Sequence, residues 1–91
     1  MRVSQTAAIT IALLLGLAQQ AQAQDASRMS CEELWLARNQ IYANNGYCFQ
    51  TQRARAIFGH GCVPPFGQLA PEEAREVSAL QSWERRRGCS S

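Results

Sequence analysis

Apolar residues recur at helical spacing between residues 31 and 42. They lie at Cys31, Leu34, Trp35, Ile41 and Tyr42. This spacing of three, four and seven residues predicts a helix that buries one face. Ser30 with Glu33 three residues later forms the pattern of a capping box, so the helix should begin at Cys31. It should end before Gly46, where a left-handed glycine would bring Tyr47 against Tyr42 in a Schellman motif.

A second, shorter helix is predicted over residues 52–58. Thr51 is a suitable N-cap and Gly59 a suitable stop. The positions expected to face inward are Ala54, Ile57 and Phe58. The stretch GHGCVPPFGQ at 59–68 holds too much glycine and proline for a helix or a central strand. It therefore predicts a loop, which is ordered if Cys62 is bridged.

A third helix is expected from Pro71, with Glu72 and Glu73 at the positive end of its dipole. Ala70 is a poor N-cap, so we expect this end to fray. The inward positions are Ala74, Val77, Leu80 and Trp83, and Gly88 ends the helix. Because no strand-like alternation occurs, the predicted fold class is a small all-α domain of three helices.

The first 23 residues have the pattern of a cleaved signal peptide. A positive start precedes an apolar run from Ala7 to Ala18, and Ala21-Gln22-Ala23 fits the small-x-small cleavage rule. A transmembrane anchor would need about 20 apolar residues, more than this run supplies. We therefore predict a signal peptide at 1–23, a mobile polar lead at 24–30 and a helical domain at 31–91. The protein is expected to be periplasmic or secreted.

Cysteines make up four of the 68 residues that follow the predicted leader. An even count in a short exported chain is typical of disulfides, which a thin core needs. Four cysteines allow three connectivities, and the sequence does not fix which. If the first and third helices pack antiparallel, Cys31 can meet Cys89, and Cys48 can then meet Cys62. That geometry favours this pairing.

Charge and chemistry argue against several functions. Eight arginines against seven acids leave the mature part nearly neutral, so nothing suggests a nucleic-acid partner. Cysteine separations of 17, 14 and 27 residues do not suit zinc, and no other cofactor is expected. His60 near Cys62 could form a thiolate pair, but this would leave an odd number of cysteines. Most glutamates are explained as helix starts rather than as a glycosidase pair. The sequence thus predicts a protein that is not an enzyme.

The pattern LWLARNQIYANNGYCF at 34–49 resembles the YARHG domain, a small bacterial extracytoplasmic module. The similarity extends from Cys31 to Cys89 and includes Pro71 with its two following acids. Asn44 and Asn45 stand where the name-giving motif has Arg and His. The resemblance implies an exported module acting at the cell envelope, and it brings no catalytic residues with it.

Arg38 falls within the apolar stripe of the first helix, where an unpaired charge is unfavourable. It could pair with Glu76 or Glu84 of the third helix, bind a ligand carboxylate such as that of a cell-wall stem peptide, or be exposed. Aromatic rings could stack on sugars or anchor a partner, although a small core usually buries them. Tyr47, Phe66 and Trp83 are the rings expected to be partly exposed.

The candidate binding residues are Arg38, Asn39, Tyr42, Tyr47 and Trp83. The expected partner is an envelope component, either peptidoglycan or an envelope protein. The alternative is a structural or regulatory protein with one protein partner and no affinity for glycan. Arg85, Arg86 and Arg87 could touch anionic lipid or polysaccharide, but they are better explained as partners of the helix dipole.

Overall fold

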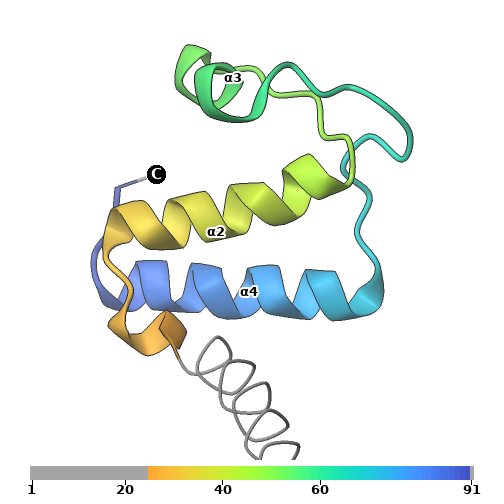
Figure 1. Cartoon of the computed structure of the whole chain (residues 1–91). Coiled ribbons are helices and arrows are strands. Elements are labelled where there is room, and N and C mark those ends of the chain that lie inside the picture. Colours follow the sequence, from red (N-terminus) through yellow and green to blue (C-terminus); the bar gives the residue numbers. More distant parts are fainter. Residues whose placement is uncertain (1–24, 91) are drawn as a thin grey trace, which may run out of the picture.

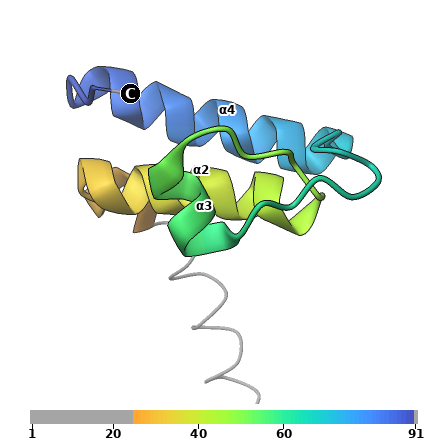
Figure 2. The ribbon, with the colours of Figure 1, turned by 90° about the horizontal axis from the view of Figure 1, so that it is seen from above.

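The computed structural model describes residues 25–90, which form three α-helices after a short 3-10 helix. The elements are η1 (Asp25–Arg28), α2 (Cys31–Asn44), α3 (Gln52–Phe58) and α4 (Pro71–Arg86). Helices α2 and α4 lie side by side and run antiparallel, and α3 packs on the other side of α2 (Figures 1 and 2). The predicted all-α class is confirmed. The predicted leader at 1–23 lies outside the described residues.

Both ends of α2 are formed by the residues from which they were predicted. The Glu33 N–H donates to Ser30 Oγ at 3.1 Å, and the Ser30 N–H donates to Glu33 Oε1 at 3.0 Å. At the other end, the Tyr47 N–H reaches the Tyr42 carbonyl at 3.2 Å, while Gly46 is left-handed with φ 71°. This is the expected Schellman motif, and it turns the chain back over α2.

The start of α4 is held by a side chain that does not belong to its N-cap. Ala70 offers no side-chain acceptor, but its N–H donates to Glu73 Oε1 at 2.9 Å. Glu73 Oε2 in turn accepts a hydrogen bond of 2.8 Å from Asn45 Nδ2. Asn45 follows the last residue of α2, so this bond ties the end of one helix to the start of the other. The end predicted to fray therefore has two bonds that hold it.

The far end of α4 is a second Schellman motif. The Gly88 N–H donates to the Arg85 carbonyl at 3.1 Å, and the Cys89 N–H donates to the Glu84 carbonyl at 2.9 Å. Gly88 has φ 69°, the conformation that such an end requires. This turn carries Cys89 toward the first residue of α2.

Two disulfides fasten the helices, with the pairing that the antiparallel geometry favoured. Cys31 bonds to Cys89 with a Cα–Cα distance of 5.5 Å, closing the α2–α4 pair at one end. Cys48 bonds to Cys62 with a Cα–Cα distance of 4.0 Å, joining the segments before and after α3. An isolated β-bridge between Cys48 and Gly61 lies beside the second disulfide. The loop at 59–68 is thus crosslinked to the segment that enters α3.

Few side chains are fully buried, and several positions predicted to be buried are not. The buried apolar residues are Leu34, Phe49, Ala54, Val77 and Leu80. Ile57 is 50% exposed, and Cys31 and Ala74 are also exposed, so those three predictions are wrong. In a domain of three helices, the neighbours of each helix cover only a narrow stripe of it. Positions at the edge of a stripe therefore stay in contact with water.

The polar lead is ordered over residues 25–28, contrary to the expectation of a mobile segment. It forms the 3-10 helix η1, and the Arg87 side chain donates a hydrogen bond to the Ser27 carbonyl. This contact places η1 against the end of α4 (Figure 1). Within residues 25–90, the helices are all too short or too polar to cross a membrane.

Candidate functional site

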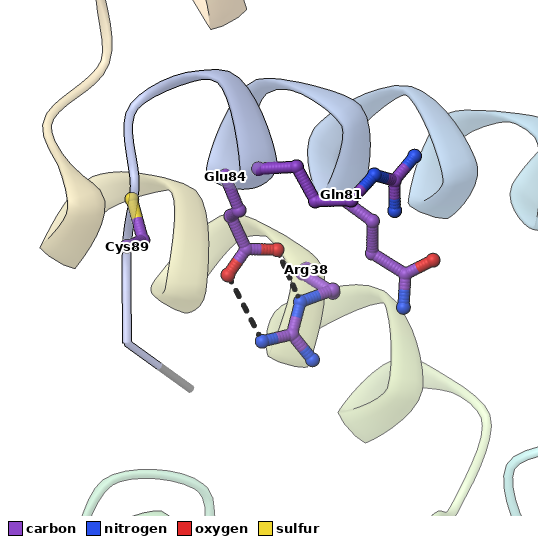
Figure 3. A pocket seen from close by; sticks show the side chains of 5 residues that line it. Arg38, Gln81, Glu84 and Cys89 are labelled. Carbon is purple, nitrogen blue, oxygen red and sulfur yellow. Dashed lines mark hydrogen bonds and ion pairs between the residues drawn. The ribbon is translucent and has the colours of Figure 1, made fainter.

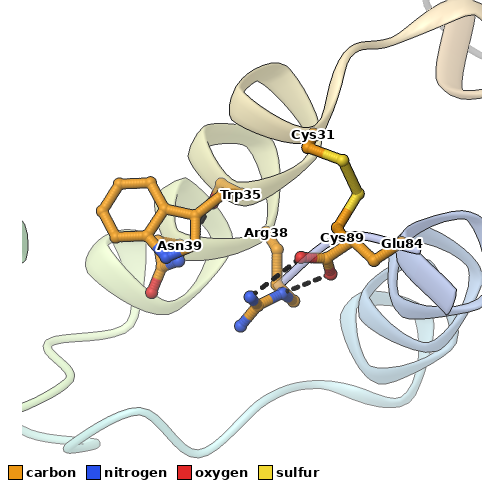
Figure 4. Close-up of polar contacts among 6 residues, drawn as sticks. All are labelled: Cys31, Trp35, Arg38, Asn39, Glu84 and Cys89. Carbon is orange, nitrogen blue, oxygen red and sulfur yellow. Dashed lines mark hydrogen bonds and ion pairs between the residues drawn. A yellow bond between two sulfur atoms is a disulfide. The ribbon is translucent and has the colours of Figure 1, made fainter. Parts of the chain in front are cut away.

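An ion pair joins Arg38 of α2 to Glu84 of α4 (Figure 4). Arg38 Nε is 2.7 Å from Glu84 Oε1, and Arg38 Nη2 is 3.1 Å from Glu84 Oε2. The two side chains are only 18% and 12% exposed. A bidentate pair of this kind fixes both position and orientation of the guanidinium. Of the two predicted acidic partners, the structure uses Glu84, whereas Glu76 is exposed.

Two pockets lie on either side of Arg38. The α2–α4 pocket, of about 320 Å³, is lined by Arg38, Gln81, Glu84, Arg85 and Cys89 (Figure 3). The α2–α3 pocket, of about 220 Å³, is lined by Trp35, Arg38, Asn39, Tyr47, Phe49, Gln50, Thr51 and Ala54. The first opens beside an intact salt bridge and a disulfide. The second is bounded by the chain that the Schellman motif of α2 turns back.

Aromatic rings form a continuous cluster along the α2–α3 pocket. Tyr47 lies between Tyr42, at a centroid distance of 5.4 Å, and Phe49, at 5.0 Å. Phe49 stacks on Phe58 at 5.2 Å. Phe58 in turn approaches the Trp35 ring at 6.0 Å. The rings therefore pack mainly on one another, and Tyr47, at 37% exposure, is the most accessible of those in the cluster.

The polar side chains of the α2–α3 pocket are oriented by the backbone. Asn39 Nδ2 donates to the Trp35 carbonyl at 2.9 Å, and Gln50 Nε2 donates to the Cys48 carbonyl at 3.1 Å. Thr51 Oγ1 accepts from the Ala54 N–H at 3.1 Å as the cap of α3. Each amide thereby keeps its carbonyl oxygen as an acceptor for a ligand. Trp35 and Asn39 lie on the side of α2 away from Glu84 (Figure 4).

The structure brings three of the five predicted binding residues together. Arg38, Asn39 and Tyr47 line the α2–α3 pocket. Tyr42 contacts Tyr47 at the end of α2 but is not part of the pocket lining. Trp83 is on α4, half-buried, with the Arg86 guanidinium 4.8 Å from its ring centroid. The binding role of these residues stays a prediction.

Other residues of the α2–α3 pocket were missed as binding candidates. Phe49, Gln50 and Thr51 belong to the link between α2 and α3, which the Cys48–Cys62 disulfide joins to the loop after α3. The aromatic-Cys-aromatic triplet around Cys48 was the available signal, since a bridged cysteine fixes the rings that flank it.

The structure gives other roles to the residues that were considered for catalysis or metal binding. His60 is exposed in the loop, and the Cys62 beside it is in a disulfide. Residues 25–90 contain no group of three or more metal-binding side chains. The Ser30 backbone N–H and then the Ser30 side chain lower the pKa of Glu33 from its usual 4.5. The Asn45 side chain and then the Ala70 N–H lower the pKa of Glu73 in the same way. These two acids serve helix ends.

The Tyr-Ala-Asn-Asn-Gly stretch at 42–46 is a helix end pressed against the loop. A side-chain Cβ on Gly46 would lie 2.0 Å from the Val63 carbonyl oxygen, so only glycine fits. Asn45, where the motif's name has His, bonds the Ile41 carbonyl and Glu73, both at 2.8 Å. The part of the motif that this chain keeps is therefore the part that ends α2.

The sequence model of the YARHG domain matches residues 9–85, most of the chain. The match starts before, and ends short of, the Cys31 to Cys89 span expected from the resemblance. No curated protein and no solved structure matches the chain.

Proposed function

Because the chain belongs to the YARHG domain family, we propose that it is an exported, non-enzymatic module that binds peptidoglycan in the cell envelope. The observation that supports this proposal is the α2–α3 pocket. It gathers two amides, a hydroxyl, an accessible tyrosine and a guanidinium around one small cavity. Such a set offers both donors and acceptors at fixed positions, as a specific binding site requires.

The size of the pocket limits what it can hold. Its volume of about 220 Å³ is below the roughly 300 Å³ of the smallest sites that enclose drug-sized ligands. One sugar ring or one amino-acid residue of a larger polymer would fit. Peptidoglycan presents both kinds of group repeatedly, so many weak contacts on one sacculus could add up.

The absence of catalysis is part of the proposal and is supported by how the reactive groups are used. All four cysteines are in disulfides. The carboxylates of Glu33 and Glu73 accept hydrogen bonds at helix starts, and Glu84 is bound to Arg38. A carboxylate fixed in this way is poorly placed to transfer protons.

Export is proposed from two independent features. The predicted leader at 1–23 is one, and the disulfides are the other, because such bonds persist in oxidising compartments. The predicted location is the periplasm or the exterior. N-terminal sequencing of the exported protein should give a chain that starts at Gln24, and a chain that retains Met1 would contradict the proposal of export.

Binding is tested by co-sedimentation of the exported, oxidised protein with purified sacculi. We expect the protein to pellet with sacculi and Asn39→Ala to reduce the pelleted fraction. Asn44→Ala is the matched control, because Asn44 is also on α2 but is exposed and bonds only Gln40 in the described part of the chain. Equal pelleting of the protein and of an unrelated small disulfide protein would rule out peptidoglycan as the partner.

A protein partner is the second candidate, and one observation favours it. Val63 and Phe66 in the loop are 55% and 56% exposed, and Ile57 of α3 is 50% exposed. Exposed apolar side chains that gather in a patch often mark a protein contact, and Val63 and Phe66 belong to one loop. If sacculi do not retain the protein, crosslinking in intact cells with a photoreactive residue at position 66 would test this reading. A single crosslinked protein band would support it.

A further inference from the structure

We propose that Arg38 binds a carboxylate in the α2–α3 pocket, so that the recognised part of the ligand is an acidic peptide group rather than a neutral sugar. This inference rests on the proposed function and names the portion of peptidoglycan that the pocket takes. The basis is the edge of the Arg38 guanidinium that does not bond Glu84.

An arginine side chain has five N–H donors arranged around a planar group. Glu84 occupies the edge formed by Nε and Nη2. The edge formed by Nη1 and the second N–H of Nη2 makes no hydrogen bond within residues 25–90. Figures 3 and 4 show the remaining nitrogen pointing away from Glu84. Two parallel N–H groups on one edge match the two oxygens of a carboxylate.

The charges around the pocket favour an anion. Arg38 is the only charged residue in the α2–α3 lining, which has no carboxylate. Helix α3 carries Arg53 and Arg55 and no acidic residue. Arg53 is paired with Glu32, but Arg55 donates to the Phe49 carbonyl at 2.8 Å and has no acidic partner in the described chain. Glu84 offsets one charge, and Arg55 leaves the local balance positive.

The aromatic cluster argues against a stacked sugar. A sugar ring stacks on a free ring face, and the Arg53 guanidinium covers one face of Trp35 at 3.8 Å from its centroid. Phe49 is 3% exposed and stacks on Phe58 at an interplanar angle of 17°. Tyr47 offers its exposed part beside Arg38, where its ring can contact the aliphatic portion of an amino acid.

Glu84 also prepares the guanidinium for this role. Arginine normally loses much side-chain freedom when it binds a ligand. Here the bond to Glu84 already fixes the plane of the group, so the free edge is presented without further ordering. Asn39 follows Arg38 in α2 and lines the same pocket. Its amide oxygen can accept a hydrogen bond from a peptide N–H.

The test uses soluble disaccharide-peptide fragments released from sacculi by a muramidase. Binding to the exported, oxidised protein is measured by calorimetry with untreated fragments and with fragments whose carboxylates have been converted to amides. We expect amidation to weaken binding about tenfold, the loss typical of a charge-assisted pair. Because this comparison uses the unaltered protein, it does not depend on whether a variant folds.

Two substitutions locate the effect. Arg38→Lys keeps the charge but not the planar fork, and it should weaken binding of the untreated fragments toward the value for amidated ones. Arg85→Gln is the control, because Arg85 lines only the α2–α4 pocket, and it should leave binding unchanged. An effect of Arg85→Gln as large as that of Arg38→Lys would overturn the assignment to the α2–α3 pocket.

The outcomes separate this inference from the proposed function. Equal affinity for untreated and amidated fragments, with retention on sacculi intact, would refute the carboxylate site and leave the binding function standing. No binding to sacculi or to either fragment would refute both.

Discussion

Gly46→Ala should destabilise the protein far more than the same change at the end of α4. An alanine at φ 71° takes on left-handed strain of about 1–2 kcal/mol. Its Cβ would also lie 2.0 Å from the Val63 carbonyl oxygen and 2.7 Å from Val63 Cγ2. The loop must then move away, which breaks the 3.1 Å hydrogen bond from the Val63 N–H to the Gly46 carbonyl. That bond contributes about 1 kcal/mol. Together these terms predict a loss of about 2–3 kcal/mol.

Gly88→Ala is the matched control. Gly88 also ends a helix in a Schellman motif with φ 69°, but a Cβ there meets no atom within 4 Å. Only the left-handed strain applies, and the lower entropy of the unfolded chain offsets part of it, so the expected loss is about 1 kcal/mol. Urea unfolding of both oxidised variants, followed by circular dichroism, measures the difference. Equal losses of free energy would show that contact with Val63 contributes nothing.

Four further predictions concern charges and crosslinks. Glu84→Gln should cost about 2–4 kcal/mol of unfolding free energy because it leaves Arg38 partly buried and unpaired. Glu32→Gln breaks an exposed pair and should cost less than about 1 kcal/mol by the same urea assay. Glu33 and Glu73 have folded-state pKa values below 4.5, so their stabilisation is complete above pH 4.5 and is lost as pH falls through those values. Thermal melts across this range should show a shallower acid loss when both are changed to Gln. Reductant removes crosslinks worth about 4 and 3 kcal/mol, and calorimetry should show that the cooperative transition disappears. A reduced protein that melts like the oxidised one would contradict the account of a thin core.

Helix ends were the most predictable part of the structure because local chemistry determines them. Ser30, Thr51 and Gly46 each act within four or five residues of their own position. The disulfide pairing was predictable for a related reason. Once α2 and α4 are antiparallel, the cysteines at one end of the pair are neighbours, and only one partner is left for each of the others.

Burial was less predictable, since it depends on how much of each helix its neighbours cover. Ile57 belongs to the apolar pattern of α3, yet α3 contacts Trp35 of α2 through Phe58 and Arg53 and leaves Ile57 in water. Phe49 shows the opposite case. It lies outside every helix, and its burial results from the crosslinked loop that holds it over α2. The α2–α3 pocket could not be predicted from local sequence either, because it depends on the same crosslinked loop.

The place of the family motif in the structure bears on where binding should be sought. Tyr42, Ala43 and Gly46 form the turn that ends α2, and Asn45 ties that turn to α4. The role of these residues is therefore to position neighbouring segments of the chain. The turn positions the segment from Tyr47 to Thr51. Residues of this segment line the α2–α3 pocket together with Arg38 and Asn39 of α2. Replacement of the usual Arg and His by Asn44 and Asn45 leaves this arrangement in place. Sequence differences at those two positions should therefore alter stability more than ligand affinity, whereas a change at Arg38 should alter both.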